Sequence, residues 1–318
     1  MMQLKERFLS FLEGNRDSRF VITSHKNLDL DALCCCYALK SAFPNSTLAY
    51  PDKMDSPAKA FAEKLGMEFS ELGKLNPSDY DGMLVVDCST TVLLPEAKKW
   101  KVKLVIDHHH PQGEGNGITT PLLLRDEDAP STAEMLAELL PSVSPEISHV
   151  LAVAIISDTA RFKSSRASTF STLASLLEKC GKPYAELLES AEPELELDEK
   201  LFVLEMFKKM HISAHGGYSI ATVIVPAHES LISSSLSEFS DVVFAAHWNM
   251  EEKETRVSSR ARKHVPVPLN EVMRGAATEL GGGGGGHPKA AGCSSKERPE
   301  ATLEKCIEVF VRKLDSSQ

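Results

Sequence analysis

The sequence contains no apolar run long enough to span a bilayer, which takes about 20 residues. One of its longest apolar runs, Val150–Ile156, is far shorter than that. The first residues carry charge early and lack the apolar stretch and small-residue cleavage site of a secretory signal. They are better explained as an amphipathic helix with Leu4, Phe8, Phe11 and Leu12 on one face. We therefore expect a soluble, cytoplasmic protein without a membrane partner.

The sequence also lacks an excess of positive charge. Its 35 Lys and Arg residues are outnumbered by 45 Asp and Glu residues, which gives a net charge of −10. Proteins that hold long nucleic acids by neutralising phosphates usually present a basic face, so no stable long nucleic-acid partner is expected. The charge does not exclude a phosphate substrate at a metal centre, because the ions supply positive charge locally.

Evidence for paired cysteines is missing as well. The chain has seven cysteines, of which Cys34, Cys35 and Cys36 are consecutive. An odd number leaves one over, and adjacent cysteines do not easily all pair, so reduced thiols are the better interpretation. No Cys-x-x-Cys pair offers a zinc site. The triplet is best explained as small apolar filler at the start of a helix.

The first half of the chain has the alternation typical of an α/β protein. Three short, apolar segments, Phe20–Ser24, Met83–Asp87 and Lys103–Asp107, fit buried parallel strands. Helical patterns are found at Asp31–Ala42, Pro57–Leu65, Ser131–Leu140 and Pro145–Ile156. Ser131 and Glu134 have the spacing of a capping box. The pattern predicts a parallel sheet covered by helices.

The length of 318 residues favours two domains. We predict a first domain at residues 1–190, a linker within 191–215 that contains a helix at Asp198–Met210, and a second domain at 216–318. The second domain is expected to be a smaller, mixed-sheet α/β domain. Its predicted strands are Tyr218–Val225, Asp241–Asn249 and Thr255–Arg260, and its predicted helices are Leu269–Leu280 and Ala301–Leu314. Between those helices lie six consecutive glycines, Gly281–Gly286.

Acids and histidines occur where the predicted strands of the first half end. The first strand is followed by His25, Asp29 and Asp31, the second ends in Asp87, and the third ends in Asp107 followed by His108 and His109. Ligands of open parallel sheets bind outside the carboxyl ends of the strands, so these side chains should converge. Asp158, after the apolar helix, adds a further acid.

Carboxylates and imidazoles together select Mn²⁺, Co²⁺, Zn²⁺ or Mg²⁺. Four Asp and two His suffice for two ions bridged by one carboxylate. Taken singly, an acid such as Asp31 or Asp87 at a strand end could be only the N-cap of the next helix. That explanation weakens because the ends of all three strands and the end of the apolar helix carry residues that can bind a metal ion. His110 is expected to be a bystander.

These residues form motifs that resemble the DHH phosphoesterase family with its glycine-rich C-terminal domain, over roughly residues 18–314. The motifs are His25-Lys-Asn27-Leu-Asp29-Leu-Asp31-Ala32, Val86-Asp87, Asp107-His108-His109, Ser157-Asp158-Thr159 with Arg161-Phe162, and Gly283–Gly286 followed by His-Pro-Lys-Ala-Ala-Gly. The family usually has Pro and Gly where Leu28 and Leu30 stand and Gly where Ala160 stands. The glycine run is also longer than the usual four. None of these departures falls on a ligand position.

The resemblance implies two divalent metal ions, with Mn²⁺ preferred and Mg²⁺ or Co²⁺ as alternatives, in the cleft between the domains. One ion would be held by His25, Asp29 and Asp87, and the other by Asp31, Asp87, His108 and Asp158, with Asp87 as the bridge. The implied catalytic residues besides Asp87 are His109, facing the scissile phosphate, and Asp107, orienting the histidines. The implied nucleotide-binding residues of the C-terminal domain are Arg260, Gly284, Gly285, Gly286 and His287.

The function implied by the resemblance is hydrolysis of phosphodiester or phosphomonoester bonds in short oligonucleotides or small nucleotides, such as nanoRNA, pApA, cyclic di-AMP or pAp. Three alternatives remain: a single-strand exonuclease acting on longer DNA or RNA, a pyrophosphatase, or a non-catalytic nucleotide sensor. The related pyrophosphatases have a C-terminal domain without the glycine signature, and sensors usually lose metal ligands, none of which is missing here. A homodimer is compatible with the sequence, which does not fix the oligomeric state.

Overall fold

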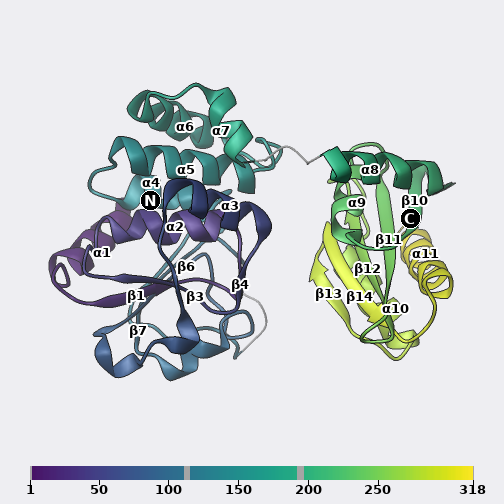
Figure 1. Cartoon of the computed structure of the whole chain (residues 1–318), viewed down its shortest axis with the longest axis horizontal. Helices are drawn as coiled ribbons and strands as arrows, with labels where there is room; N and C mark the ends of the chain where they lie inside the picture. Colours follow the sequence, from purple (N-terminus) through teal and green to yellow (C-terminus); the bar gives the residue numbers. More distant parts are fainter. Residues whose placement is uncertain (1, 111–114, 192–196, 318) are drawn as a thin grey trace. The chain divides into compact units, whose positions relative to one another are not determined.

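The computed structural model describes residues 2–110, 115–191 and 197–317. The chain divides into two compact units, Met1–Glu194 and Leu195–Gln318 (Figure 1). None of the described helices combines the length and apolar character needed to cross a membrane.

The first unit is built on a parallel sheet, as predicted. Its strands run in the order β5 (Ser70–Glu71), β3 (Thr47–Tyr50), β1 (Phe20–Thr23), β6 (Gly82–Val86), β7 (Val102–Asp107) and β8 (Leu123–Arg125), and all neighbouring pairs are parallel. Every residue of β1 and β6 is buried, as expected for strands covered on both faces. A separate parallel ladder joins β2 (Asn27–Leu28) to β4 (Lys53–Met54).

The α-helices of the first unit gather on one face of this sheet (Figure 1). They are α1 (Met2–Glu13), α2 (Leu30–Lys40), α3 (Ser56–Leu65), α4 (Thr132–Leu139), α5 (Pro145–Asp158), α6 (Ala167–Cys180) and α7 (Tyr184–Ala191). Their core includes Ile22, Leu84 and Ile106 of the strands. The opposite face packs Val85 against Leu72 and Leu94 and is covered by loops and the short helices η1 (Leu72–Lys74), η2 (Pro77–Asp79) and η3 (Pro95–Lys99).

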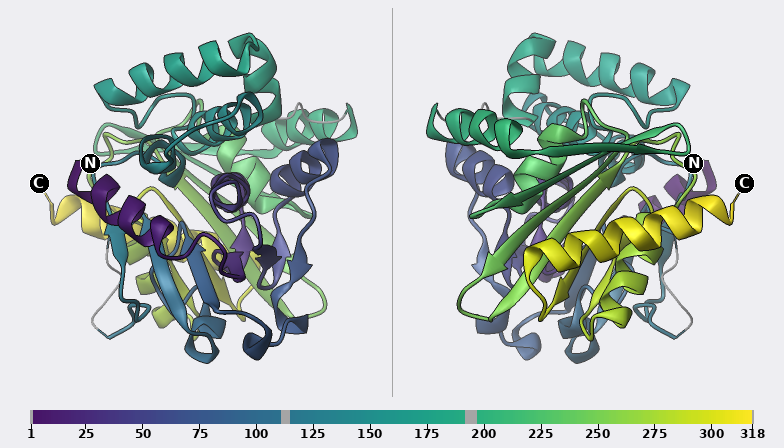
Figure 2. Two further views of the ribbon diagram at one scale, coloured as in Figure 1. Left: turned by 90° about the vertical axis from the view of Figure 1, so that its left-hand side faces the viewer. Right: turned by 90° about the vertical axis from the view of Figure 1, so that its right-hand side faces the viewer.

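The second unit has the predicted mixed sheet. Its order is β13 (Gly284–His287), β14 (Ala290–Ser295), β12 (Glu254–Ala261), β11 (Val242–Asn249), β10 (Tyr218–Val225) and β9 (His211–His215). Only the β10–β11 pair is parallel among these described strands. One face packs Phe244 against α10 (Leu269–Glu279) and α11 (Pro299–Asp315), and α11 crosses the strands in the right-hand view of Figure 2. The other face packs Val243 against α8 (Leu197–Lys209) and α9 (Glu229–Leu236).

Several details differ from the sequence-based expectations. The predicted linker helix is α8, whose Val203 and Met206 belong to the core of the second unit; residues 192–196 of the predicted linker lie outside the described part. The cysteine triplet lies in the middle of α2, not at its start, and is fully buried. Part of the predicted glycine loop is strand β13, because its backbone pairs with β14. The helices α6, α7 and α9 were not predicted.

Candidate metal centre

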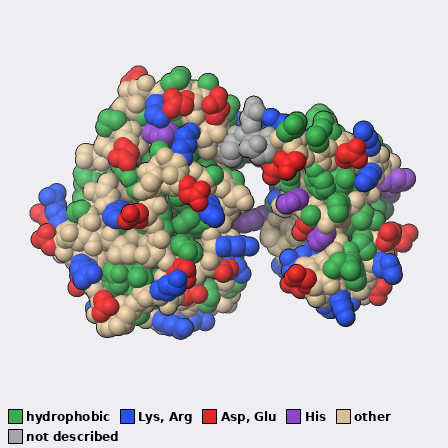
Figure 3. Space-filling model, in the orientation of Figure 1, with side chains coloured by type: hydrophobic (Ala, Val, Ile, Leu, Met, Phe, Trp, Pro, Cys, Tyr) green, Lys and Arg blue, Asp and Glu red, His purple; other side chains and the backbone are tan. Residues whose placement is uncertain are grey.

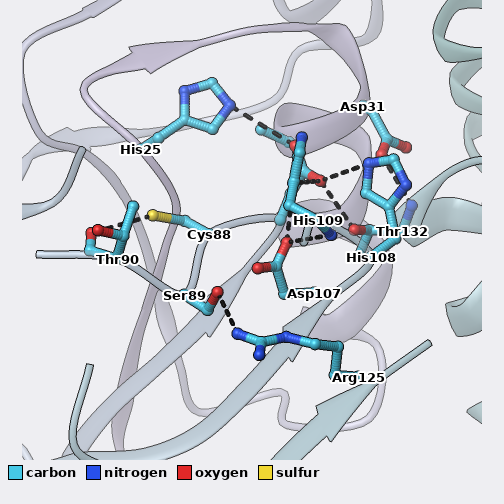
Figure 4. Close-up of polar contacts among 12 residues, drawn as sticks. His25, Asp31, Cys88, Ser89, Thr90, Asp107, His108, His109, Arg125 and Thr132 are labelled. Carbon is cyan, nitrogen blue, oxygen red and sulfur yellow. Dashed lines mark hydrogen bonds and ion pairs between the residues drawn. The ribbon is translucent and has the colours of Figure 1, made fainter. Parts of the chain in front are cut away.

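The predicted ligands of the first unit meet where three neighbouring strands end. Because β1, β6 and β7 are adjacent and parallel, His25 after β1, Asp87 after β6 and His108 after β7 all lie at one edge of the sheet. Figure 4 shows His25 and His108 projecting into this region together with Asp31, His109 and Thr132. Asp31 lies in the first turn of α2 and is buried.

Two helix ends supply the other acids. Asp29 is the N-cap of α2, and its carboxylate accepts a hydrogen bond of 3.0 Å from the backbone N–H of Ala32. Asp158 is the last residue of α5 and not, as expected, a residue beyond it. A third of its side chain is exposed to solvent. Asp29 can therefore cap α2 and still bind a metal ion, because only one of its two carboxylate oxygens accepts the capping hydrogen bond.

Ligand atoms lie within 4.8 Å of one another in each of three residue sets. Two of these sets share no residue: His25, Asp29 and Asp87 form one, and Asp31, His108 and Asp158 form the other. The third set, Asp87, His108 and His109, overlaps with both. The two carboxylate oxygens of Asp87 face different histidines. Its Oδ2 lies 3.6 Å from His25 Nε2, and its Oδ1 lies 3.6 Å from His108 Nε2. His25 Nε2 is also 3.5 Å from Asp29, and His108 Nε2 is 3.5 Å from Asp158. Asp87 thus connects the two sets.

Hydrogen bonds orient the two histidines of the third strand differently. His108 Nδ1 lies 3.0 Å from the carbonyl oxygen of Ala129, which can only accept, so His108 donates from Nδ1 and keeps Nε2 for a ligand role. His109 Nδ1 is 2.9 Å from Oδ1 of the fully buried Asp107. Of the two histidines, His109 is the one that contacts Asp107, whereas His108 contacts a backbone carbonyl. His110 is 80% exposed and pairs with Glu127.

Thr132 is a positioning residue that the sequence analysis missed. At the N-terminus of α4, the backbone N–H groups of Thr132 and Ala133 donate to the carboxylate of Asp31 over 3.0 and 3.2 Å. The Thr132 hydroxyl donates to Asp87 Oδ1 over 2.8 Å. One helix terminus therefore fixes an acid from each of the two sets, as the positive end of a helix dipole favours. The sequence signal that marked this terminus was the capping residue Ser131.

The predicted capping box at this terminus is only half formed. Ser131 accepts from the backbone N–H of Glu134, but the Glu134 carboxylate does not return to the cap. It instead accepts from Arg166 Nε over 2.7 Å and from the Ser168 hydroxyl over 3.0 Å. A fully buried carboxylate needs a charged partner, and Arg166 supplies one from the segment that leads into α6.

The electrostatics of the cluster favour a cation. Burial and the charges of Asp87, Asp158 and Asp29 raise the pKa of Asp31 well above its usual range. Burial, Asp87 and Asp29 raise the pKa of Asp158 to about 8. Burial lowers the pKa of His25, but its hydrogen bonds and attraction to Asp29 and Asp87 outweigh this and raise it to about 10. Carboxylates crowded in this way take up protons unless a metal ion neutralises them, so the donor set fits divalent metal ions.

Backbone strain is concentrated beside the same side chains. Asp87 has a φ of 54°, in the left-handed region that non-glycine residues rarely occupy. After Asp158 the three residues Ala160, Arg161 and Phe162 have φ values of 47°, 57° and 68°. Each such residue costs about 1–2 kcal/mol. The positive φ of Ala160 explains why the family that the chain resembles usually has glycine at that position.

In the second unit, strand register lines up the predicted substrate-binding residues. Arg260 of β12 pairs with Ala290 of β14, which pairs with His287 of β13, so all three point to one face of the sheet. This is the face on which Arg260 Nη2 lies 3.4 Å from the hydroxyl of Ser230 in α9. Within the described part of the chain Arg260 makes no ion pair, although its surroundings are dry enough to lower its pKa.

The glycines of β13 have different reasons to be glycine. A Cβ on Gly284 would lie 2.3 Å from the carbonyl oxygen of Met273, so packing against α10 excludes a side chain there. Gly286 has a φ of 130°, and its Cβ would lie 2.7 Å from the carbonyl oxygen of Ala290. A Cβ on Gly285 would meet nothing within 4 Å. Gly285 points to the opposite face of the sheet from Gly284 and Gly286, and the space beside it on that face is open.

Comparison with known proteins agrees with this geometry. Residues 19–157 match the model of the DHH family, N-terminal domain, and residues 228–316 match the DHHA1 domain. The chain belongs to the DHH family. It has the α/β fold of that family's phosphoesterases, and its acid and histidine clusters could hold metal ions.

Similar proteins come from several organisms. The chain is 27% identical over 315 residues to an uncharacterized protein of Methanocaldococcus jannaschii, covering 94% of each. It resembles an exopolyphosphatase-related protein from Bacteroides fragilis with a TM-score of 0.77 at 16% identity, covering 99% of this chain and 98% of that one. It also resembles RecJ from Thermus thermophilus, solved in complex with Mn²⁺, with a TM-score of 0.54 at 17% identity, covering 98% of this chain and 55% of that one. At these identities the structural likenesses show the fold.

Proposed function

We propose that this DHH-family chain hydrolyses phosphodiester or phosphomonoester bonds of short oligonucleotides or small nucleotides, using two divalent metal ions. The observation that supports it most directly is the position of Asp87, whose two oxygens face His25 in one ligand set and His108 in the other. A carboxylate placed in this way can bridge two ions. We assign one ion to His25, Asp29 and Asp87.

The other ion is assigned to Asp31, Asp87, His108 and Asp158. Oxygen and imidazole ligands suit Mn²⁺, and the similar RecJ structure holds Mn²⁺, so we propose manganese as the preferred metal, with Mg²⁺ or Co²⁺ as substitutes. When bound, the ions supply Lewis acidity for the phosphoryl group and activate a water molecule.

The residues of the chain itself position the reacting groups. Thr132 holds the carboxylate of Asp87 through its hydroxyl and that of Asp31 through its backbone N–H. In the metal-free chain burial lowers the pKa of His109, but the hydrogen bond to Asp107 and the nearby carboxylates raise it to about 9. We propose that His109 donates a hydrogen bond to an oxygen of the scissile phosphate from Nε2, because Nδ1 is engaged by Asp107.

Recognition of the nucleotide is proposed to come from the second unit. Arg260 is an arginine without an ion-pair partner in the described chain, and it shares a face with the open space at Gly285. Glycine backbone lets a phosphate approach the N–H groups closely, and a guanidinium can bind a phosphate with two hydrogen bonds. We propose Arg260, Gly284, Gly285, Gly286 and His287 as the substrate grip.

Charge favours short substrates over long strands. The chain has a net charge of −10, and acidic and basic side chains are interspersed over the face shown in Figure 3, without a continuous basic stripe there. A protein that follows a long strand needs such a stripe. The exonuclease alternative is kept as an outcome of the test below because the fold is shared with RecJ.

A substrate panel with Mn²⁺ tests the proposal. It should include pAp, pApA, cyclic di-AMP, a 5-mer RNA, a 24-mer single-stranded DNA and pyrophosphate. We expect turnover of the nucleotides that contain one to five residues and none of pyrophosphate. Turnover of the 24-mer alone would favour an exonuclease, and no turnover of any compound, with normal metal binding, would favour a nucleotide sensor.

Arg260→Ala tests the grip separately from the metal centre. A charge-assisted contact to phosphate contributes roughly 1.5–3 kcal/mol, so kcat/KM for pApA should fall about 10–150-fold. Hydrolysis of bis-p-nitrophenyl phosphate, which has no second phosphate, should barely change. Arg256→Ala is the matched control, because Arg256 lies on the same strand but already pairs with Glu252 and Glu254. Equal losses on both substrates would make Arg260 structural or catalytic instead.

A further inference from the structure

Unpaired positive charge gathers near the amino-terminal end of β7. Lys98 and Lys99 end the short helix η3, Lys101 precedes β7, and Lys103 is its second residue. Within residues 2–110, 115–191 and 197–317, none of these four lysines makes an ion pair. Burial and the adjacent Lys101 lower the pKa of Lys103. In a chain with a net charge of −10, this is a local excess of positive charge that an anion would neutralise.

Two of these lysines line a hollow of about 750 Å³. Lys98, Trp100 and Lys101 form one side of it, and Thr119 and Thr120 contribute from the segment before β8. Its volume falls within the range of roughly 300–1,000 Å³ that small-molecule sites occupy. The hollow therefore offers ammonium groups, hydroxyl groups and one aromatic ring to the same ligand.

Contacts with the protein hold both sides of the hollow in place. The Trp100 ring lies 5.8 Å from the Tyr80 ring at an angle of 52°. The segment that carries Thr119 is tied down by an antiparallel bridge between Thr90 and Gly117. A planar indole held in this way can stack on a nucleobase, while neighbouring lysines pair with phosphate oxygens.

The hollow is distinct from the metal-ligand cluster. β7 runs from Val102, beside the lysines, to Asp107, beside the metal ligands. At about 3.3 Å per residue these ends are roughly 16 Å apart. A ligand held by Lys98 and Lys101 would therefore leave the metal ligands untouched.

We propose that this hollow binds a nucleoside phosphate as a second, non-catalytic site. Lys98 and Lys101 bind the phosphate group, and Trp100 contacts the base. Inorganic phosphate alone would satisfy the lysines but not the ring, and a nucleoside alone would satisfy the ring but not the lysines. The site is independent of the proposed hydrolytic function, because none of its residues belongs to the metal cluster or to the substrate grip.

The fluorescence of Trp100 reports binding directly. The chain has two tryptophans, so Trp248→Phe leaves Trp100 as the single reporter. The full-length variant is titrated with AMP in the presence of EDTA, which prevents metal-dependent turnover. We expect a saturable change with AMP, with adenosine and inorganic phosphate each binding at least about tenfold more weakly, a difference of about 1.4 kcal/mol for each. No saturable change, or binding of either fragment as tight as that of AMP, would overturn the proposal.

Variants then locate the signal. Lys98→Gln combined with Lys101→Gln should weaken AMP binding at least about tenfold. Lys99→Gln is the matched control, because Lys99 is an exposed lysine of the same segment that does not line the hollow. The Lys99→Gln variant should show the same AMP-dependent change in Trp100 fluorescence as the parent. Retained binding in the double variant, with folding verified by circular dichroism, would place the ligand elsewhere and refute the site.

Discussion

Metal binding at the acid and histidine cluster should release about two protons at pH 7, one from Asp158 and one from His25. Burial and neighbouring acids raise the pKa of Asp31 well above its usual range and that of Asp158 to about 8. Hydrogen bonds to Asp29 and Asp87, acting against burial, raise the pKa of His25 to about 10. Asp158 and His25 therefore each carry a proton at neutral pH, and an ion has to displace it to use the atom as a ligand.

The released protons set how steeply affinity depends on pH. Release of about two protons strengthens apparent metal affinity roughly 100-fold per pH unit. This dependence of the affinity on pH should hold between pH 6 and 7.5. Above pH 8 Asp158 loses its proton even without a metal, so the gain in affinity per pH unit should become about tenfold smaller.

The same pKa shifts determine the stability of the metal-free chain. His25, with its pKa raised from 6.5 to about 10, stabilises the folded state below pH 6.5, and this stabilisation is lost as pH rises through 10. Asp158, with its pKa raised from 3.8 to about 8, destabilises the folded state increasingly between those two values, because the folded chain binds more protons than the unfolded chain. Both contributions become less favourable as pH rises, so the gain in melting temperature on adding Mn²⁺ should be larger at pH 8.5 than at pH 6.

Calorimetric titration with Mn²⁺, in buffers of different ionisation heat, counts the protons. Asp158→Asn should lower the count by about one. His110→Gln is the control, because His110 is exposed and pairs with Glu127 outside the cluster, and it should leave the count unchanged. Release of less than one proton, together with an affinity that does not vary with pH, would refute the assignment of these residues as ligands.

Four further predictions concern the metal centre, the length of the substrate and the glycines of β13. Asp87→Ala should abolish turnover and lower bound Mn²⁺, because both oxygens of Asp87 are engaged, and near-normal turnover would show that Asp87 is not the bridge. Hydrolysis should fall steeply between dinucleotides and strands longer than about ten nucleotides, and equal rates on a 2-mer and a 24-mer, with strong salt dependence, would indicate an exonuclease. Gly284→Ala should cost about 1–3 kcal/mol of stability because its Cβ would lie 2.3 Å from the carbonyl oxygen of Met273. Gly285→Ala should leave the melting temperature unchanged and lower kcat/KM for pApA, and a loss of stability without a loss of activity would contradict the role of Gly285 in binding.

Much of the fold could be predicted from the sequence because burial leaves a local pattern. The central strands of the first unit are short apolar runs with both faces covered, and β6 is buried throughout. The helices α3 and α5 begin with Asp55 and Ser144 as N-caps and have Pro in their first turn, which are signals within a few residues. The helix α7 was missed because it has only 8 residues, and α6, which has 14, was missed because Ser and Thr residues interrupt the apolar pattern of its first half. The backbone pairing of β13 with β14 was missed because glycines carry no side-chain periodicity.

Part of the candidate site, too, could be predicted from the sequence, and part could not. The types and order of its acids and histidines are written in the sequence, and the rule that parallel strands end at one edge is enough to bring them together. The sequence does not reveal the contacts that orient them: Thr132 reaches Asp31 across 101 positions, and Ala129 reaches His108 across 21. Nor does it tell Gly284, which packs against a carbonyl, from Gly285, which faces open space. Local patterns record which residues are buried or end a strand, whereas hydrogen-bond partners and free volume depend on how distant segments pack, and only the tertiary structure decides that.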